Sequence, residues 1–361
     1  MLADMPRVQR EFRRLKRVLR GRLARNVIAL YGLRAFDQLL PLLVFWYLTR
    51  TLLPEGLGLF AFANACAMYG IVIVEYGFGF SGTRAVASAR DQPGQLAELI
   101  TGVFAVQVLL SVVVALAAAA ARFLVPQFQE QPLLLWAGLA FAILQGFNPV
   151  WYFTGQERIS LIVLVTAGVK LLTTLAIFAL VGAPDDSWVV LACYAGGALL
   201  ATTTGYALMM REVRPQRLSR GPIGRAFRLG ASLFVMRVVL MTQGAGIVIL
   251  LGFLAPHHVP LYAVSDKLCR PVAWLLGPLN TALLPRLSHL VGTSPDRAQQ
   301  IARLSLLLQG TAGIAFGLTI ALTAPWLIDL MFGQEYAAAA AALQVMATII
   351  PLMVLNGALI T

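Results

Sequence analysis

Apolar runs long enough to cross a lipid bilayer recur along nearly the whole chain. About 20 consecutive apolar residues span the hydrocarbon core of a bilayer as a helix. Ten such runs occur, separated by shorter polar segments: residues 27–49, 58–80, 96–120, 132–152, 160–182, 188–210, 229–254, 259–284, 303–326 and 339–359. The pattern predicts an all-α polytopic membrane protein with about ten transmembrane helices.

Composition agrees with this class and excludes others. Hydrophobic residues make up 59% of the 361 positions and charged residues only 12%, which excludes an ordinary soluble domain. The three cysteines, Cys66, Cys193 and Cys269, lie in apolar runs without Cys-x-x-Cys spacing, so we interpret them as small buried hydrophobic residues. Neither a phosphate-binding Gly-x-x-x-x-Gly-Lys loop nor a zinc-ligand spacing occurs. We therefore expect no metal or cofactor, and no ATP hydrolysis by this chain.

Lys and Arg are distributed unequally between the two sides of the predicted membrane. With the N-terminus in the cytoplasm, 21 of the 28 basic residues fall in cytoplasmic segments and four on the external side, including Lys267 and Arg270 in the outer half of the span 259–284. Cytoplasmic loops carry this excess in membrane proteins, so we interpret the net charge of +12 as topology and not as a nucleic-acid-binding face. Residues 1–26 predict a basic amphipathic tail on the lipids of the cytoplasmic leaflet.

The basic segment 211–228 divides six predicted spans from four. We expect an N-lobe of six helices over residues 27–210, a cytoplasmic linker over 211–228 and a C-lobe of four helices over 229–361. At an offset of 202 residues, PEGLGLFA at 54–61 falls on PHHVPLYA at 256–263. The starts of the spans at 27 and 229 coincide at the same offset. The repeat predicts two related bundles of six helices, of which the second lacks its last two in this chain.

Charged residues inside predicted spans are the candidates for function. Such charges are costly in a bilayer, and they usually face a protein interior or a water-filled pathway. Five are cationic and three are anionic: Arg34, Asp37, Glu75, Lys170, Arg237, Asp266, Lys267 and Arg270. A guanidinium suits phosphate oxygens. The excess of positive charge therefore favours an anionic substrate.

Structural explanations for these charges remain open beside the functional one. Arg34 and Asp37 lie three residues apart on one helix face, and Asp266 and Arg270 lie four apart, so each pair could neutralise itself. Lys170 has threonines near it, and its ammonium group could find hydrogen-bond partners within the packed helices. Arg237 has no acidic residue within one helical turn.

Several segments together resemble the Wzx-type flippases of the multidrug/oligosaccharidyl-lipid/polysaccharide exporter superfamily. They are VEYGFGFSGTRAVASAR at 74–90, PVWYFTGQERIS at 149–160, PEGLGLFAFA at 54–63, LYAVSDKL at 261–268, LLPRLS at 283–288 and MFGQEY at 331–336. Their order and spacing cover about the whole chain. The resemblance implies a MATE-like two-lobe architecture in the bacterial inner membrane.

The same resemblance implies a function and partners. The expected activity is translocation of an undecaprenyl-diphosphate-linked oligosaccharide to the periplasmic leaflet for O-antigen, capsule or exopolysaccharide synthesis, by alternating access through a cationic cavity. Polysaccharide polymerase and assembly proteins are candidate partners, and H⁺ or Na⁺ is a candidate coupling ion. The alternatives are a cation-coupled multidrug antiporter of the same superfamily, a non-transporting scaffold, and a membrane glycosyltransferase or polymerase, which the short external loops disfavour.

The expected site residues follow from the charges and the resemblance together. Arg34, Lys170, Arg237 and Arg270 are expected to attract the diphosphate and acidic sugars, and Asp37 to orient Arg34. Glu75 and Asp266 are candidates for coupling or gating. Arg84 and Arg286 are related by the repeat offset at predicted starts of inner loops, where they would set topology or close a cytoplasmic gate.

Overall fold

The computed structural model describes residues 39–213, 220–275, 290 and 294–359. The chain divides into two compact units, residues 1–45 and 46–361. The described part of the first unit is the start of an apolar helix, Leu39–Thr51. The predicted site residues Arg34, Asp37 and Arg286 lie outside the described residues.

The second predicted span is one long helix that is interrupted near its middle. Helix α3 (Leu53–Glu75) ends where Tyr76 and Gly77 adopt left-handed backbone angles, with φ of 49° and 77°, and α4 (Phe78–Ala89) follows at once. Gly77 adopts this conformation at little cost because it lacks a Cβ. The break permits the chain to turn and the helix to restart, so residues expected in a loop after 80 are helical.

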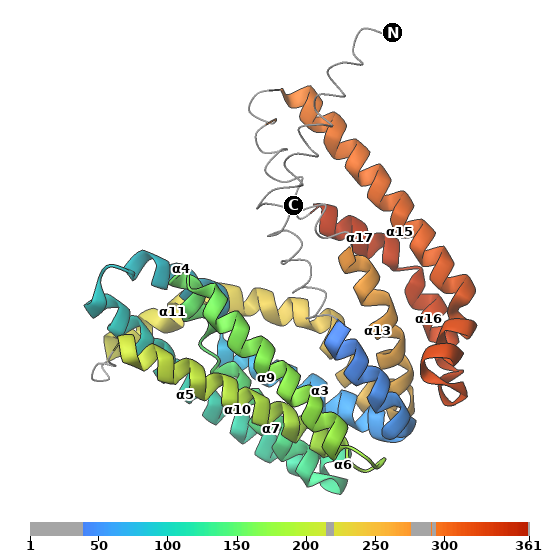
Figure 1. Ribbon diagram of the computed structural model, residues 1–361, viewed down its shortest axis with the longest axis horizontal. Helices are drawn as coiled ribbons and strands as arrows, with labels where there is room; N and C mark the ends of the chain where they lie inside the picture. Colours follow the sequence, from blue (N-terminus) through green and yellow to red (C-terminus); the bar gives the residue numbers. More distant parts are fainter. Residues whose placement is uncertain (1–38, 214–219, 276–289, 291–293, 360–361) are drawn as a thin grey trace. The chain divides into compact units, whose positions relative to one another are not determined.

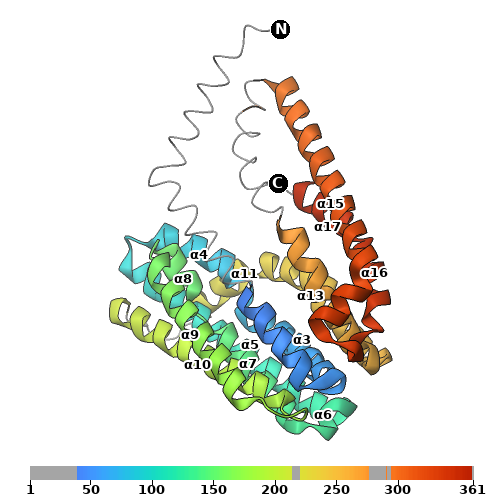
Figure 2. The ribbon, with the colours of Figure 1, turned by 45° about the vertical axis from the view of Figure 1, so that its right-hand side comes forward.

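The next four spans form a bundle whose helices run side by side (Figures 1 and 2). They are α5 (Pro93–Leu124), α7 (Pro132–Gly146) continued by α8 (Val150–Gly155), α9 (Ile159–Leu180) and α10 (Ser187–Glu212), with the short α6 (Pro126–Glu130) between α5 and α7. α5, α6 and α7 begin with proline, which is tolerated in a first helical turn because that turn's N–H groups have no intrahelical partner. α7 packs on both α10 and α3.

The seventh span contains a second interruption. α11 (Arg220–Met241) leads into a π-helix, η1 (Thr242–Gly246), and then into α12 (Ile247–Leu254). Because α11 begins at Arg220, much of the expected linker 211–228 is helical. α11 packs against α5, α4 and α3, so it is held by helices from the first half of the chain.

The remaining helices follow a 3₁₀ turn, η2 (Pro256–His258). They are α13 (Val259–Leu275), α15 (Pro295–Phe332), α16 (Ala339–Ala347) and α17 (Ile350–Leu359), with a further 3₁₀ turn, η3 (Gln334–Tyr336), before α16. α15 packs against α16 and α17, and α13 packs against α16. The Tyr336 hydroxyl donates a hydrogen bond to the Thr49 carbonyl oxygen at 3.1 Å, which ties this helical group to the end of Leu39–Thr51.

The prediction of an all-helical polytopic membrane protein is confirmed. Among the described residues, seven helices are long and apolar enough to cross a membrane, and an eighth span results if Ala339–Ala347 and Ile350–Asn356, bent by 43°, are counted together. The other two predicted spans, 27–49 and 259–284, are described only in part, as Leu39–Thr51 and α13.

Candidate functional site: a row of polar and charged residues inside the membrane helices

Glu75 and Arg237 form an ion pair that joins two membrane-spanning helices. Glu75 is the last residue of α3 and Arg237 lies in the second half of α11, and the Arg237 Nη1 donates to Glu75 Oε1. The side chains are only 19% and 27% exposed. The sequence offered no partner for Arg237 because the two residues are 162 positions apart.

Glycines make room for this pair. A Cβ added at Gly79, in the first turn of α4, would collide with Glu75 Oε1, and one added at Gly230 of α11 would collide with the Tyr76 carbonyl oxygen. The Tyr76 ring stacks on Phe234 of α11, with ring centroids 4.9 Å apart. The α3–α4 break therefore rests directly on α11, and this close approach brings Glu75 to Arg237.

The π-helix η1 continues the polar surface along the same two helices. The Tyr69 hydroxyl of α3 donates to Thr242 Oγ1 at 3.3 Å. A Cβ added at Gly246 would lie 2.9 Å from the Tyr69 hydroxyl oxygen. A π-helix inserts an extra residue into a helical turn, and such turns occur frequently at functional sites. Here the inserted turn positions its glycine beside a tyrosine hydroxyl.

Arg270 of α13 reaches the same π-helix. Its Nε donates to both Asp266 carboxylate oxygens at 2.6 Å, and its Nη2 donates to the Gln243 carbonyl oxygen at 3.2 Å. A Cβ added at Gly244 would lie 2.7 Å from that Nη2. The i,i+4 pair that the sequence predicted therefore exists, and it also contacts the interrupted helix.

We call this set the polar row. Its members lie on α3, α11, η1 or α13, and each contacts at least one other member: Tyr69, Glu75, Arg237, Thr242, Gln243, Asp266 and Arg270. Breaking a buried ion pair leaves one charge uncompensated and costs several kcal/mol, whereas the intact pair contributes little net stability. The row therefore holds two guanidinium groups, each paired with a carboxylate.

Lys170 lies apart from the polar row in the fold. It is half-buried in α9, whose main contacts are with α10 and α8. Arg84 is exposed on α4, within a helix and not at the start of a loop as the sequence suggested, because the helix restarts after Gly77. Tyr69, Thr242 and Gln243 were missed from sequence, where uncharged polar residues in apolar runs give no distinct signal.

A second group of ion pairs lies at the ends of the spans or in the loops between them. Arg90 pairs with Glu157 at 3.1 Å, and its Nη2 also donates to the Gly155 carbonyl oxygen at 2.9 Å. The Arg90 guanidinium, first through its hydrogen bond and then through its charge, lowers the pKa of the Glu157 carboxyl below its ordinary value. Arg158 pairs with Glu212, which also accepts from the Tyr152 hydroxyl at 3.0 Å. We call these two pairs the helix-end pairs.

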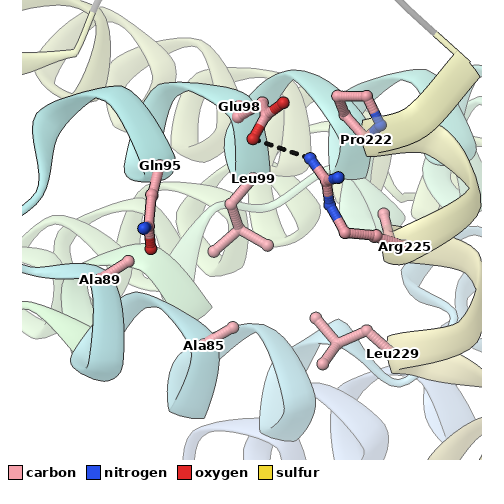
Figure 3. A pocket seen from close by; sticks show the side chains of 9 residues that line it. Ala85, Ala89, Gln95, Glu98, Leu99, Pro222, Arg225 and Leu229 are labelled. Atoms are coloured by element: carbon pink, nitrogen blue, oxygen red, sulfur yellow. Dashed lines mark ion pairs between the residues drawn. The ribbon is translucent and has the colours of Figure 1, made fainter.

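A cavity of about 500 Å³ lies between α4, α5 and α11. Arg225 of α11 reaches across it to Glu98 of α5 at 2.7 Å, above a floor that includes Ala85 and Leu229 (Figure 3). Both charged side chains are largely exposed. This pair holds the start of α11 to α5 and is a further contact between α11 and the first half of the chain.

The fold and these buried charges together define a class, the multi-pass helical transporters. A solved structure described as the inward-facing conformation of a multidrug resistance MATE family transporter of the MOP superfamily superposes with a TM-score of 0.53 over 89% of this chain and 82% of that one. Sequence identity to it is 13%, so this likeness concerns the fold.

The family described as Polysaccharide biosynthesis protein matches residues 23–291, and the chain belongs to it. Two relatives carry the name "Putative O-antigen transporter". The one from Escherichia coli (strain K12) is 27% identical over 317 residues, which are 87% of this chain and 76% of the relative. The one from Shigella dysenteriae is 26% identical over 338 residues, covering 89% and 81%.

These comparisons confirm several expectations from the sequence. The resemblance to polysaccharide flippases is confirmed by the family and the relatives, and the MATE-like architecture by the structural likeness. The chain is a multi-pass membrane protein of a transporter family and not an enzyme.

Proposed function

We propose that the protein translocates an undecaprenyl-diphosphate-linked oligosaccharide from the cytoplasmic to the periplasmic leaflet of the bacterial inner membrane. Its relatives are named for O-antigen transport. The observation that carries the proposal is the polar row, in which the Arg237 guanidinium lies on an interrupted membrane helix and the Arg270 guanidinium of α13 contacts the π-helix of that same helix. Positive charge inside membrane helices is costly and is retained where an anion passes.

The chemistry of the row suits a diphosphate. Arg237 and Arg270 are each paired with a carboxylate in the structure. A phosphate oxygen accepts the same charge-assisted hydrogen bonds, and a guanidinium binds it bidentately. In the proposed mechanism the diphosphate displaces Glu75 and Asp266 from the two guanidinium groups. Uptake of H⁺ or Na⁺ by the displaced carboxylates would couple transport to an ion gradient.

The remaining predicted residues take supporting roles in this proposal. Arg34, oriented by Asp37, and Lys170 are further cationic groups that attract the diphosphate and acidic sugars. Arg84 and Arg286 close the cytoplasmic side during alternating access between the two lobes. Tyr69, Thr242 and Gln243 offer hydrogen-bonding groups to sugar hydroxyls beside Arg270.

Complementation of a flippase-deficient strain with matched glycan tests the proposal. Wild type, Arg237→Ala, Arg270→Ala and the control Arg158→Ala are compared at equal membrane abundance. Loss of one charged hydrogen-bond partner costs about 1.5–3 kcal/mol, so the first two variants are expected to lower surface polysaccharide by about tenfold or more. Arg158→Ala removes an arginine of a helix-end pair and should retain wild-type levels.

Two results would overturn the proposal in different ways. Restoration by all four proteins equally would remove the polar row from the mechanism while leaving transport of the glycan intact. No restoration by wild type, together with resistance to cationic drugs on expression, would favour the multidrug antiporter instead.

A further inference from the structure

An apolar cavity of about 320 Å³ lies among α3, α5, α7 and α12. On α5 the wall of the cavity is formed by one face of the alanine run, which includes Ala117, Ala118 and Ala121. Small residues in such a run favour close helix packing. Here the missing side-chain volume leaves a space that no part of the described chain fills.

Aromatic rings line one end of the cavity. The Phe62 ring packs against Phe128, with centroids 5.5 Å apart, and against Phe253, with centroids 5.6 Å apart. All three residues line the cavity. From Phe62 the lining continues along α3 to Ile73, a distance of about 16 Å at the helical rise of 1.5 Å per residue.

The other end of the cavity adjoins the polar row. Tyr69 lines the cavity, yet its hydroxyl contacts Thr242 of η1. The next residue, Gln243, accepts a hydrogen bond from Arg270. The cavity is thus connected to the Arg270 guanidinium through the Tyr69 side chain and two adjacent residues of η1, Thr242 and Gln243.

We propose that this cavity holds a segment of the polyisoprenoid chain of the carrier lipid while its phosphate groups lie at the polar row. This inference rests on the proposed function. Water does not fill apolar cavities of this kind, and the four helices stand in hydrocarbon, so a hydrocarbon chain is the occupant of suitable chemistry. The adjoining guanidinium selects an amphiphile with an anionic head, and the alanine wall leaves room for the methyl branches of an isoprenoid.

Photolabelling of the purified protein tests the cavity directly. The protein is placed in nanodiscs of phosphatidylethanolamine and phosphatidylglycerol with undecaprenyl phosphate that carries a diazirine in its chain. After irradiation, labelled peptides are mapped by mass spectrometry. Label is expected on peptides of α5 and α7 that contain Ala118 and Gly138, both of which line the cavity.

The alanine and valine runs supply matched controls. Ala118→Phe and Val113→Phe place a ring in the cavity, whereas Ala120→Phe and Val112→Phe place the same ring on exposed positions that do not line it. The two cavity variants are expected to lower labelling by about tenfold, equivalent to about 1.4 kcal/mol of binding. The two controls should label as wild type does. Two positions are used so that a folding defect in one variant does not decide the outcome. The elution volume of each protein in size-exclusion chromatography shows whether that variant is folded.

Competition identifies the lipid. Excess unlabelled undecaprenyl phosphate should remove the label, and excess phosphatidylglycerol should not. Equal labelling of cavity and control variants, or equal competition by phosphatidylglycerol, would overturn the proposal. Because labelling requires no transport, a wild-type protein that labels but fails complementation would refute the proposed function and leave the cavity assignment standing. Successful complementation without cavity labelling would refute the cavity assignment and leave the proposed function standing.

Discussion

The polar row and the helix-end pairs use the same residue types in different surroundings. Glu75 and Arg237 are mostly shielded, at 19% and 27% exposed, whereas Glu157 of the Arg90 pair is 77% exposed. Exposed ion pairs contribute about 0–1 kcal/mol because water and salt screen them. The contribution of an arginine–glutamate pair to stability is therefore not fixed. It depends on how far the pair is shielded from water.

The two groups also differ in what positions them. The polar row is built where helices are interrupted, at the Tyr76–Gly77 break and at η1. The helix-end pairs connect the ends of regular helices, such as Arg158 after α8 to Glu212 at the end of α10. Interrupted helices expose backbone and admit close neighbours, which suits the exchange of contacts that the proposed mechanism requires.

The largest effect is expected from breaking the Glu75–Arg237 pair on one side. Glu75→Ala or Arg237→Ala leaves a shielded charge without its partner and should lower the free energy of unfolding by about 3–5 kcal/mol. The double variant Glu75→Met/Arg237→Met removes both charges and should regain most of that loss without regaining transport. Thermal unfolding in detergent and surface polysaccharide measure the two quantities. Single variants as stable as wild type would show that the pair is already solvated.

A smaller effect is expected from crowding the same pair. In Gly79→Ala the new Cβ meets the Glu75 carboxylate, and overpacking of this kind costs about 1–3 kcal/mol. Gly168→Ala in α9 is the matched control, because no atom lies within 4 Å of its added Cβ. That control should be neutral or more stable by up to about 1 kcal/mol, since alanine favours the helix over glycine. Equal melting temperatures for the two variants would mean that Glu75 moves away without cost.

Asp266→Asn is expected to have an intermediate to small effect on stability. The Arg270 side chain is about one-third exposed and keeps its hydrogen bond to the Gln243 carbonyl oxygen, so the loss should be about 1 kcal/mol. The level of surface polysaccharide should change more than the melting temperature does. The reason is that the Arg270 guanidinium, freed from its carboxylate, then binds an anion without displacing one. The comparison of melting temperature with surface polysaccharide separates the two effects. A loss of stability as large as that of Arg237→Ala would place Arg270 in equally shielded surroundings.

Glu157→Gln should have the smallest effect. Arg90 lowers the pKa of the Glu157 carboxyl below its ordinary value of 4.5. The pair therefore stabilises the folded state fully at pH values above 4.5, and this stabilisation is lost as the pH falls through the lowered pKa. The melting temperature of wild type should therefore approach that of Glu157→Gln in acid and differ only slightly at neutral pH. A large difference at neutral pH would show that exposed pairs here matter as much as the polar row.

The sequence by itself determined the class of protein. Apolar length and low charge specify membrane-spanning helices because a bilayer demands both, and the family motifs pointed to polysaccharide transport. The Asp266–Arg270 pair was also predictable, since residues four apart share a helix face. These features depend on local spacing, which a single chain displays directly.

Tertiary structure alone decided the rest. Glu75 meets Arg237 because the Tyr76–Gly77 break rests on Gly230 of α11, and no local pattern encodes a contact across 162 residues. The π-helix at Thr242–Gly246 has no spacing signature, and the cavity beside the alanine run exists only because α3, α7 and α12 lie around it. Contacts between distant helices depend on how side-chain volumes fit together in three dimensions, and that fit is a property of the packed chain as a whole.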